Sequence, residues 1–372
     1  VDSFPLLAVP YFIIAGEIMG KGGISKRLFN VADSMVGNKT GGIAMATIVT
    51  CMFFAAISGS GPATVAAIGG IMIPAMVQKG YDKRFATAVV ASAGSIGVII
   101  PPSIPMVIYG VSGSVSIGDM FIAGIIPGIL VGIGLMIYSY FHSKKMGYIG
   151  SGQKTTLKGI LTALWEAKWA LMIPIVILGG IYGGIFTPTE AAVVAVVFGL
   201  IVSVFVYKEL KFKDLPQIFV DSALTTASVL VIVGAATAFG RLLTLEQIPN
   251  QIAEAMISIS SEPLIIMMLI TLLLLIVGCF MDTIAAIIIL TPILLPVALQ
   301  IGYDPIHFGI IMIVNLAIGF ITPPLGVNLF VGAGISGLSL EQLSKAIVPF
   351  FFAMVITLLL IIVVPQLSLL FL

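Results

Sequence analysis

Charged side chains are scarce in this sequence of 372 residues: Asp, Glu, Lys and Arg together make up 9% of it, against 59% hydrophobic residues. The mean hydropathy of +1.22 lies far above that of soluble globular domains, in which about 25% of residues are charged. The 17 basic and 16 acidic residues leave no excess of positive charge to attract a nucleic acid. These deficits exclude an ordinary soluble domain and predict an integral membrane protein.

Histidine and cysteine are nearly missing as well, with two of each. His142 and His307 stand alone, without metal-ligand spacing around them, and Cys51 and Cys279 each lie in apolar sequence. We therefore expect free, packed thiols and neither a disulfide nor a metal site at these residues. No organic cofactor is expected either. An intramembrane enzyme is disfavoured, because the sequence has no H-E-x-x-H motif and no histidine near a candidate nucleophile.

What the sequence does have is a series of long apolar segments. A helix needs roughly 20 apolar residues to cross the hydrocarbon core of a bilayer, and this criterion predicts an all-α polytopic fold. The expected elements are 4–20, 41–78, 84–113, 119–141, 169–187, 189–207, 217–239, 263–299, 305–335 and 346–371.

The segments 41–78 and 263–299 are nearly twice as long as one span, and each has its polar break in the middle, at "SGSG" and at "MDT". We interpret both as re-entrant helical hairpins. The charges agree, because cytoplasmic loops collect Lys and Arg. If both hairpins return to the side from which they start, Arg241 alone lies outside and the other basic residues share the cytoplasmic face: Lys21, Lys26, Arg27, Lys39, Lys79, Lys83, Arg84, Lys144, Lys145, Lys154, Lys158, Lys168, Lys208, Lys211, Lys213 and Lys345. The opposite loops then carry Asp119, Glu190, Glu246, Glu254, Glu262 and Asp304.

The chain also contains a repeat. A shift of 222 residues aligns "IMIPAMVQKGYD" (71–82) with "ILLPVALQIGYD" (293–304) and "IGVIIPPS" (96–103) with "IGFITPPL" (318–325). In this register Pro74, Gly80, Gly97, Pro101, Pro102, Gly110 and Pro127 fall on Pro296, Gly302, Gly319, Pro323, Pro324, Gly332 and Pro349, and Ser60 falls on Asp282. The loop at Lys79 is inside and its equivalent at Ile301 outside, which predicts an inverted-topology repeat. Paired interrupted helices in such repeats are typical of secondary transporters, whose binding site lies near the midplane.

Several motifs resemble those of one family. The run "GGISKRLFNVADSMVGN", the hairpin "FFAAISGSGPATVAAIGGIMIPAM", then "GYDKRFATAVVASAGSIGVIIPPSIPMVIYG", "GCFMDTIAAIIILTPILLPV" and "GFITPPLGVNLFV" resemble the large (DctM-like) membrane subunit of tripartite ATP-independent periplasmic (TRAP) transporters, over essentially the whole chain. Family members usually have further membrane sequence before "DSFPLLAVPYFIIAGE", so we expect an N-terminally truncated scaffold here.

The resemblance implies an elevator-type symporter, not an enzyme, in the inner (cytoplasmic) membrane of a bacterium or archaeon. It implies sodium-coupled uptake of an organic acid, such as a C4-dicarboxylate or a sialic acid. The implied partners are a small four-helix membrane subunit and a periplasmic substrate-binding protein.

This reading divides the chain into five parts. Residues 1–40 form a scaffold helix and a cytoplasmic amphipathic segment, and 41–118 form the first transport repeat. Residues 119–262 form scaffold and connecting helices, 263–340 the second transport repeat, and 341–372 a C-terminal scaffold helix.

The polar breaks are the expected site, because broken backbone at membrane depth is tolerated only inside protein or beside a cavity. At "SGSGPAT", Ser60 suits an N-cap and Pro62 the first turn of the returning helix, which would direct free N–H groups at an anion. No Lys, Arg or His lies in a hairpin tip or beside a Pro-Pro break. We therefore expect backbone N–H groups, hydroxyls and bound cations to balance the charge of the substrate. The expected substrate-binding residues are Ser60, Gly61, Thr64, Ser103, Thr283 and Asn328.

Two sodium sites related by the repeat are expected, built largely from freed carbonyl oxygens. The expected ligands are Ser58, Gly59, Ser95, Gly97 and Ile100 in the first site, and Asp282, Asn315, Gly319 and Thr322 in the second. For Asp282 three roles stay open: a sodium ligand, a proton carrier, or an N-cap of the second hairpin arm. Glu17 is expected to be an interfacial anchor or a contact with the small subunit.

Two other transport functions compete with this reading. A stand-alone carboxylate or ion carrier of similar build would work without a binding protein. An ion channel would also use polar breaks and re-entrant loops, but paired hairpins on opposite faces favour alternating access.

Overall fold

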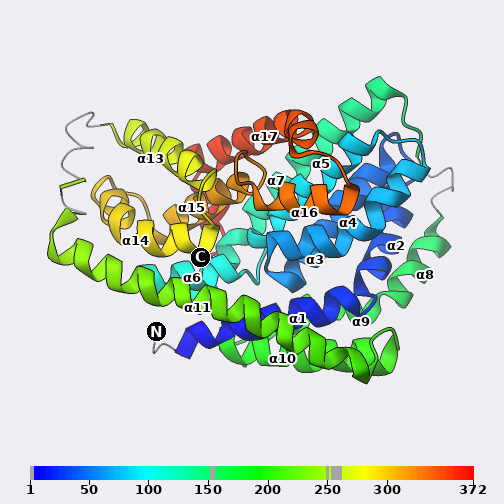
Figure 1. Ribbon diagram of the computed structural model, residues 1–372, viewed down its shortest axis with the longest axis horizontal. Helices are drawn as coiled ribbons and strands as arrows, with labels where there is room; N and C mark the ends of the chain where they lie inside the picture. The colour runs from blue at the N-terminus through cyan, green and yellow to red at the C-terminus, as the bar shows by residue number, and fades with distance from the viewer. Residues whose placement is uncertain (1–3, 151–155, 249–250, 253–261) are drawn as a thin grey trace.

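Helices form every regular element in the described part of the chain, residues 4–150, 156–248, 251–252 and 262–372 of a computed structural model (Figure 1). The predicted all-α fold is therefore confirmed. Lys154 and Glu254, two of the charges used to orient the chain, lie outside the described residues.

Both predicted hairpins are present. The first consists of α3 (Gly42–Ser58) and α4 (Gly61–Gln78), and the second of α13 (Pro263–Gly278) and α14 (Thr283–Gln300). In Figure 1, α3 and α4 lie in the right half of the view and α13 and α14 in the left half, so the hairpins approach the middle from opposite ends. Each polar break thus turns the chain back, as the sequence predicts.

Both predicted discontinuous helices are present as well. The first runs as α5 (Lys83–Gly94), the 3₁₀ turn η2 (Ser95–Val98) and α6 (Ile104–Gly113), and the second as α15 (Pro305–Gly319) and α16 (Val327–Ser336). Each break contains its Pro-Pro pair, with a cis peptide bond between the two prolines. The order of hairpin and broken helix recurs at the predicted spacing, so the repeat has a structural counterpart.

The remaining helices surround these two units. At the N-terminus they are η1 (Phe4–Leu7), α1 (Ala8–Lys21) and α2 (Ile24–Val36). Between the repeats they are α7 (Ile117–Met146), α8 (Leu157–Glu166), α9 (Lys168–Tyr182), α10 (Pro188–Leu200), the π-helix η3 (Ile201–Val206), η4 (Phe212–Asp214) and α11 (Leu215–Leu245). At the C-terminus they are α17 (Leu340–Val363) and α18 (Gln366–Leu369).

Three predicted boundaries are wrong. The segment 169–187 corresponds to α9, which ends earlier, at Tyr182, and the chain bends by 65° just before it, between α8 and α9. Leu157, Leu161 and Trp165 expose one apolar face of α8, as expected of a helix that lies along the surface before the chain turns inward. The segment 346–371 begins earlier, at Leu340, behind a capping box of Ser339 and Gln342, and ends at Val363. The segment 217–239 is longer at both ends, as α11.

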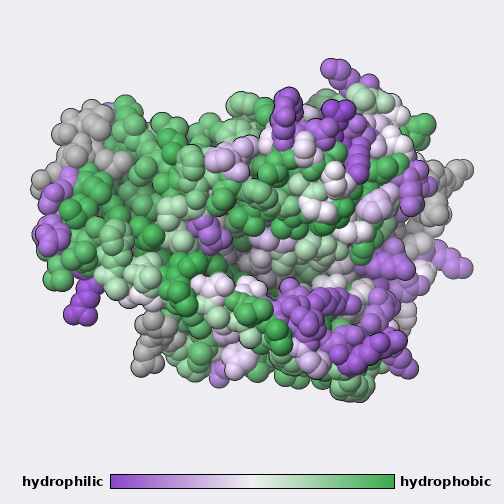
Figure 2. Space-filling model, in the orientation of Figure 1, coloured by the Kyte–Doolittle hydropathy of each residue, from purple (hydrophilic) through white to green (hydrophobic). Residues whose placement is uncertain are grey.

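Seven helices of the described chain are long and apolar enough to cross a membrane, or up to eight if α8 and α9 form one bent span. The protein is a multi-pass membrane protein. Hydrophilic side chains gather at the right-hand end of Figure 2, over α2 and α8, while the surface over α13 and α14 is mainly hydrophobic. Two hydrogen bonds draw three basic loops together at the hydrophilic end: Gly41 donates to the Tyr148 carbonyl at 3.2 Å, and the Asp82 amide donates to the Tyr148 hydroxyl at 3.0 Å.

The packing defines a layer formed by α1, α10 and α11, which lies along the lower edge of Figure 1. Within it, α1 packs against α10 and α11. Towards the repeats, α1 contacts α3 and α4, and α11 contacts α14. The candidate site lies at this seam between the hairpins and the layer. The division into scaffold and transport parts by residue range stays a prediction.

Candidate functional site

The first hairpin tip is a compact hydrogen-bonded turn. Ser60 caps α4 by accepting the N–H of Ala63 at 3.4 Å, and Pro62 follows in the first turn, so the predicted cap is confirmed. The Thr64 hydroxyl donates to the Ser60 carbonyl at 2.8 Å and lies 2.9 Å from the Ser58 hydroxyl. The polar groups of "SGSGPAT" therefore form hydrogen bonds with one another, and these bonds fix the shape of the tip.

This tip is bonded to the first broken helix. The Ile104 N–H donates to the Gly59 carbonyl at 3.2 Å. Gly59 has φ of +59°, and a Cβ added to it would lie 2.9 Å from the Pro102 carbonyl oxygen. A Cβ on Gly97 would lie 2.5 Å from the Ser60 carbonyl oxygen. Both glycines are thus needed for the backbones to approach this closely.

The Pro-Pro break itself is held by Ser103. Its hydroxyl donates to the Val98 carbonyl at 2.6 Å and accepts the N–H of Met106 at 3.4 Å, which caps α6. Ser103 is buried and does not line the cavity described below. The side chain of Ile100 lies against Gly128 of α7.

The second tip repeats the arrangement with a carboxylate. Asp282 caps α14 by accepting the Ile284 N–H at 2.9 Å, so its predicted capping role is confirmed and the two other roles stay predictions. The Leu325 N–H donates to the Cys279 carbonyl at 3.1 Å. A Cβ added to Gly319 would lie 2.5 Å from the Gly278 carbonyl oxygen. Each tip is therefore tied to the break of its own repeat.

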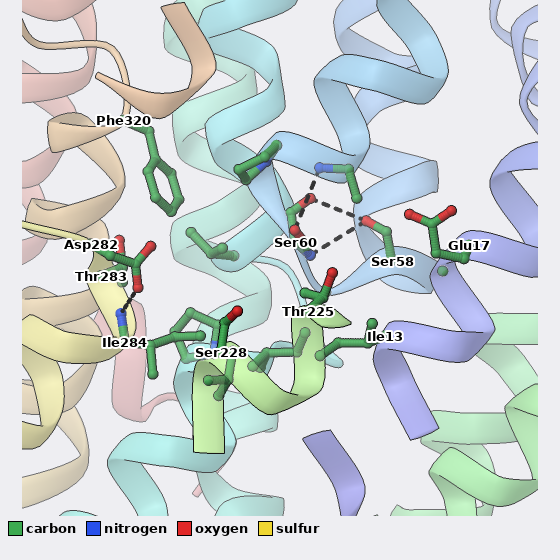
Figure 3. A pocket seen from close by; sticks show the side chains of 18 of the residues that line it. Ile13, Glu17, Ser58, Ser60, Thr225, Ser228, Asp282, Thr283, Ile284 and Phe320 are labelled. Atoms are coloured by element: carbon green, nitrogen blue, oxygen red, sulfur yellow. Dashed lines mark hydrogen bonds between the residues drawn. The ribbon is translucent and has the colours of Figure 1, made fainter. Parts of the chain in front are cut away.

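The two tips face one cavity of about 300 Å³. Figure 3 shows Ser58 and Ser60 on one side of it and Asp282 and Thr283 on the other, with Phe320 above Asp282. Five of the predicted site residues line it, from both repeats: Ser58, Gly59, Ser60, Asp282 and Thr283. The sequence-based expectation that both tips share one pocket is thus met by the geometry.

The other predicted site residues do not line this cavity: Gly61, Thr64, Ser95, Gly97, Ile100, Ser103, Asn315, Gly319, Thr322 and Asn328. Several of them hold neighbouring elements. The Asn315 amide donates to the Thr271 carbonyl of α13 at 3.1 Å, and the Thr322 hydroxyl, in the break after α15, donates to the Ile318 carbonyl of α15 at 2.8 Å. The Asn328 amide reaches the first repeat and donates to the Ser95 hydroxyl at 3.1 Å.

Two amide oxygens of these predicted site residues have no hydrogen-bond partner among the described residues, Oδ1 of Asn315 and Oδ1 of Asn328. Both side chains are fully buried. A buried acceptor without a donor is costly unless a water or an ion satisfies it, and hard cations prefer such neutral carbonyl oxygens. These two atoms therefore fit the predicted cation-binding chemistry.

Sequence reasoning missed the contribution of the α1–α11 layer. Ile13 and Glu17 of α1 and Thr225 and Ser228 of α11 complete the cavity wall, as Figure 3 shows. Glu17 lines the cavity and pairs with Lys21 at 3.5 Å, and its predicted roles as an interfacial anchor or a contact with the small subunit stay predictions. The spacing of Thr225 and Ser228, three residues apart in an apolar helix, was the available signal for a polar face.

The electrostatics of the wall favour cations. Glu17 and Asp282 are its two carboxylates, and the lining residues of the described chain include no Lys, Arg or His. Hydroxyls of Ser58, Ser60, Thr225, Ser228 and Thr283 add oxygen ligands. A lone organic anion would meet these two carboxylates, of which Glu17 already pairs with Lys21 at 3.5 Å, whereas an anion that arrives with cations would be compensated.

Comparison with known proteins gives a consistent result. Residues 1–367 match the family described as tripartite ATP-independent periplasmic transporter, DctM component. The isethionate TRAP transporter permease protein DctMQ of Oleidesulfovibrio alaskensis is 55% identical over 371 residues, which cover 100% of this chain and 58% of that relative. The chain thus spans less than two thirds of the length of that relative.

Two further relatives are similar over nearly their whole length. The C4-dicarboxylate TRAP transporter large permease protein DctM of Pseudomonas aeruginosa is 41% identical, with 99% of this chain and 86% of the relative covered. The sialic acid TRAP transporter large permease protein SiaM of Vibrio cholerae is 40% identical, with 100% and 86% covered. Among solved structures, the Alcanivorax borkumensis YdaH transporter has the same fold, with a TM-score of 0.62 and 14% identity over 95% of this chain and 84% of that chain.

Proposed function

Since the chain belongs to the DctM component family of tripartite ATP-independent periplasmic transporters, we propose that it is the permease through which a small organic acid enters a bacterial cell across the inner membrane. The observation that carries this proposal is the shared cavity, in which two oppositely placed hairpin tips meet the α1–α11 layer. The proposed partners are a small four-helix membrane subunit and a periplasmic binding protein.

Relatives suggest the substrate class. They are named for isethionate, C4-dicarboxylates and sialic acid, all of them organic acids that carry a carboxylate or a sulfonate. The relative named for isethionate is the most similar of the three by identity. Isethionate is therefore the first substrate to test, followed by a C4-dicarboxylate and a sialic acid.

Sodium coupling is proposed on the charge of the cavity. Glu17 and Asp282 line it together with hydroxyl oxygens, and the Oδ1 atoms of Asn315 and Asn328 are buried acceptors without partners among the described residues. Sodium ions bound to such oxygens would offset the negative charge of the substrate, which is costly at membrane depth by at least a few kcal/mol.

Uptake into proteoliposomes tests this coupling. The chain, the small subunit and the binding protein would be reconstituted together with labelled isethionate outside. We expect uptake on an inward sodium gradient and none on a proton gradient without sodium. Equal uptake on protons alone would overturn sodium coupling. Full uptake without the binding protein would instead favour the stand-alone carrier.

An elevator movement is proposed because the repeats are hydrogen-bonded to each other through Asn328, whereas α1 and α11 of the layer meet them in packing contacts. Each tip is bonded to its own broken helix, and Asn328 of α16 is bonded to Ala91 of α5. Charged pairs such as Lys21–Asp221, at 3.2 Å, instead tie α1 to α11 within the layer. The two bodies would slide at the seam that contains the cavity.

Cysteine cross-links test the movement. A Cβ on Gly20 of α1 would lie 3.7 Å from the Cβ of Ala67 in α4, a spacing that suits a disulfide. Oxidation of a Gly20→Cys/Ala67→Cys variant, with Cys51 and Cys279 replaced, should arrest uptake until it is reduced. The matched pair Gly332→Cys/Ala91→Cys has the same 3.7 Å spacing inside one body and should transport when cross-linked. Arrest by both pairs, or by neither, would contradict sliding at this seam.

A further inference from the structure

Two further cavities lie at the seam between α7 and α17, and neither shares a lining residue with the cavity between the hairpin tips. The larger is a groove of about 690 Å³ whose lining residues are all from these two helices. They are apolar apart from the hydroxyls of Tyr138 and Thr357, and Thr357 is satisfied within its own helix by the Ala353 carbonyl at 2.9 Å. Nothing in the groove requires a polar ligand.

The groove is open at the surface of the protein, where exposed apolar side chains form its rim. Ile137 and Phe141 of α7 are 53% and 63% exposed, and Phe352 and Ile356 of α17 are 57% and 67% exposed. Its α7 wall runs from Leu130 to Phe141, which at 1.5 Å per residue is about 16 Å. That length is close to half of the roughly 30 Å hydrocarbon core. The groove therefore has the depth of a single leaflet.

The smaller cavity, of about 370 Å³, continues the groove at one end. Tyr138 and Pro349 line both cavities. Beyond them the wall becomes polar and contains Arg84 of α5, Lys345 of α17 and His142 of α7. The apolar groove thus ends in a cationic pocket.

The charge of that pocket favours an anion. Its one acidic lining residue, Asp82, accepts the N–H groups of Arg84 and Phe85 at 2.9 and 3.1 Å as the cap of α5. Arg84 lies 3.8 Å from this carboxylate, and Lys345 pairs with Glu341 at 2.7 Å, but both basic side chains are exposed, by 59% and 77%. Such exposed pairs are weak, so both cations are accessible to an incoming anion.

The expected position of the basic pocket at the cytoplasmic side of the membrane also favours an anionic ligand. The pocket lies where α7 ends in Lys144 and Lys145 and α5 begins at Lys83, the end that positive charge predicts to be cytoplasmic. The cytoplasmic leaflet carries anionic lipids, which basic residues at the membrane surface attract. Tyr148 adds a hydroxyl that accepts the Asp82 amide and keeps its own proton to donate.

From this continuity of an apolar groove of leaflet depth with a basic pocket, we infer that the α7–α17 seam is a binding site for one anionic phospholipid. Its acyl chains lie in the groove, and its phosphate and glycerol headgroup meets Arg84 and Lys345. The site is separate from the transport cavity and does not depend on the proposed function.

Native mass spectrometry of the purified chain tests the site by titration with phosphatidylglycerol and with phosphatidylcholine of the same acyl chains. We expect phosphatidylglycerol to bind more tightly and inorganic phosphate in excess not to displace it. In the Arg84→Gln/Lys345→Gln variant, the affinity for phosphatidylglycerol should fall about thirtyfold, which is about fivefold for each charge removed. Its affinity for phosphatidylcholine should not change.

A matched variant, Lys26→Gln/Lys158→Gln, removes two exposed basic residues that line neither cavity, and it should bind phosphatidylglycerol normally. Equal affinity for the two lipids would mean that the groove contacts lipid without selecting an anionic headgroup, and it would overturn the inference. Equal loss of phosphatidylglycerol affinity in both variants would mean unspecific charge attraction and would overturn the inference. Displacement by phosphate would mean an anion pocket without a lipid, which would overturn it as well.

The variant Ile356→Trp tests the position of the acyl chains, because it enlarges an exposed side chain of the groove. It should weaken the binding of both lipids while the protein stays folded. Unchanged binding of both lipids would contradict the placement of the acyl chains in the groove.

Discussion

The side-chain amide of Asn328 in α16 donates a hydrogen bond of 3.0 Å to the carbonyl of Ala91 in α5, which lies 237 residues earlier in the chain. The same nitrogen lies 3.1 Å from the Ser95 hydroxyl. Asn328 is fully buried, and its bonds join the broken helix of one repeat to that of the other. A buried polar side chain that links two repeats in this way fixes how they pack.

Asn328→Ala should therefore destabilise the protein. Buried hydrogen bonds of this kind contribute about 1 to 3 kcal/mol when a partner is removed, and the lost volume adds a cavity. A clearly lower apparent melting temperature in detergent is expected. Asn30→Ala, at an exposed position of α2, is the control and should have almost no effect; equal melting temperatures for the two variants would show that the inter-repeat bonds do not matter.

Gly59→Ala should disrupt the first hairpin tip. A left-handed backbone costs a residue with a Cβ about 1–2 kcal/mol, and here the new Cβ would also press on the Pro102 carbonyl oxygen, 2.9 Å away. Gly302→Ala has the same left-handed penalty, at φ +87°, but its Cβ meets nothing within 4 Å. We expect uptake to fall at least tenfold more in the first variant than in the second, and similar rates would disprove the close packing of tip and break.

Asp282→Asn separates the capping role from the charge. Asn caps helices about as well as Asp, so the melting temperature should stay near that of the wild type. Loss of the carboxylate should raise the sodium concentration needed for half-maximal uptake severalfold, because the cavity loses one of its two negative charges. Asp304→Asn changes the matching cap of α15, which lies outside the cavity, and its sodium dependence should not change. An unchanged sodium dependence in Asp282→Asn would leave capping as the role of this residue.

The sequence was sufficient to predict the hairpins and the broken helices, because Gly and Pro constrain the backbone locally. "SGSG" and the two Pro-Pro pairs interrupt helices wherever they occur in apolar sequence, so their positions could be read without knowledge of the packing. The cap by Ser60 is a local interaction of the same kind.

Hydrophobic periodicity could not predict the faces that α1 and α11 present to the cavity, and the spacing of Thr225 and Ser228 indicates a polar face of α11 without showing what that face contacts. In an apolar helix that contacts both lipid and protein, hydrophobic periodicity no longer distinguishes the two sides. Thr225 and Ser228 line the site only because α11 packs against α14 and α1. The hydrogen bond of Asn328 to the other repeat and the bend between α8 and α9 also depend on tertiary packing, so the sequence alone did not predict them.

Asp33 should make the stability of the protein depend on pH. It lies in α2, outside the candidate spans, and burial raises the pKa of its carboxyl above 3.8, against a smaller lowering by Lys79. Its Oδ1 has no hydrogen-bond partner among the described residues. Because the folded pKa is raised, the protonated form favours folding. This contribution is complete below the unfolded pKa near 3.8 and is lost as the pH rises through the folded value.

Asp33→Asn mimics the protonated carboxyl at every pH. We expect the variant to be more stable than the wild type at neutral pH and the difference in melting temperature to shrink as the pH is lowered towards 4. Glu166→Gln, at an exposed position of α8, should show no difference that changes with pH. A stability gain for Asp33→Asn that stays constant from neutral pH down to 4 would point to altered packing instead, because only a half-buried carboxylate that takes up a proton over this range can close the gap.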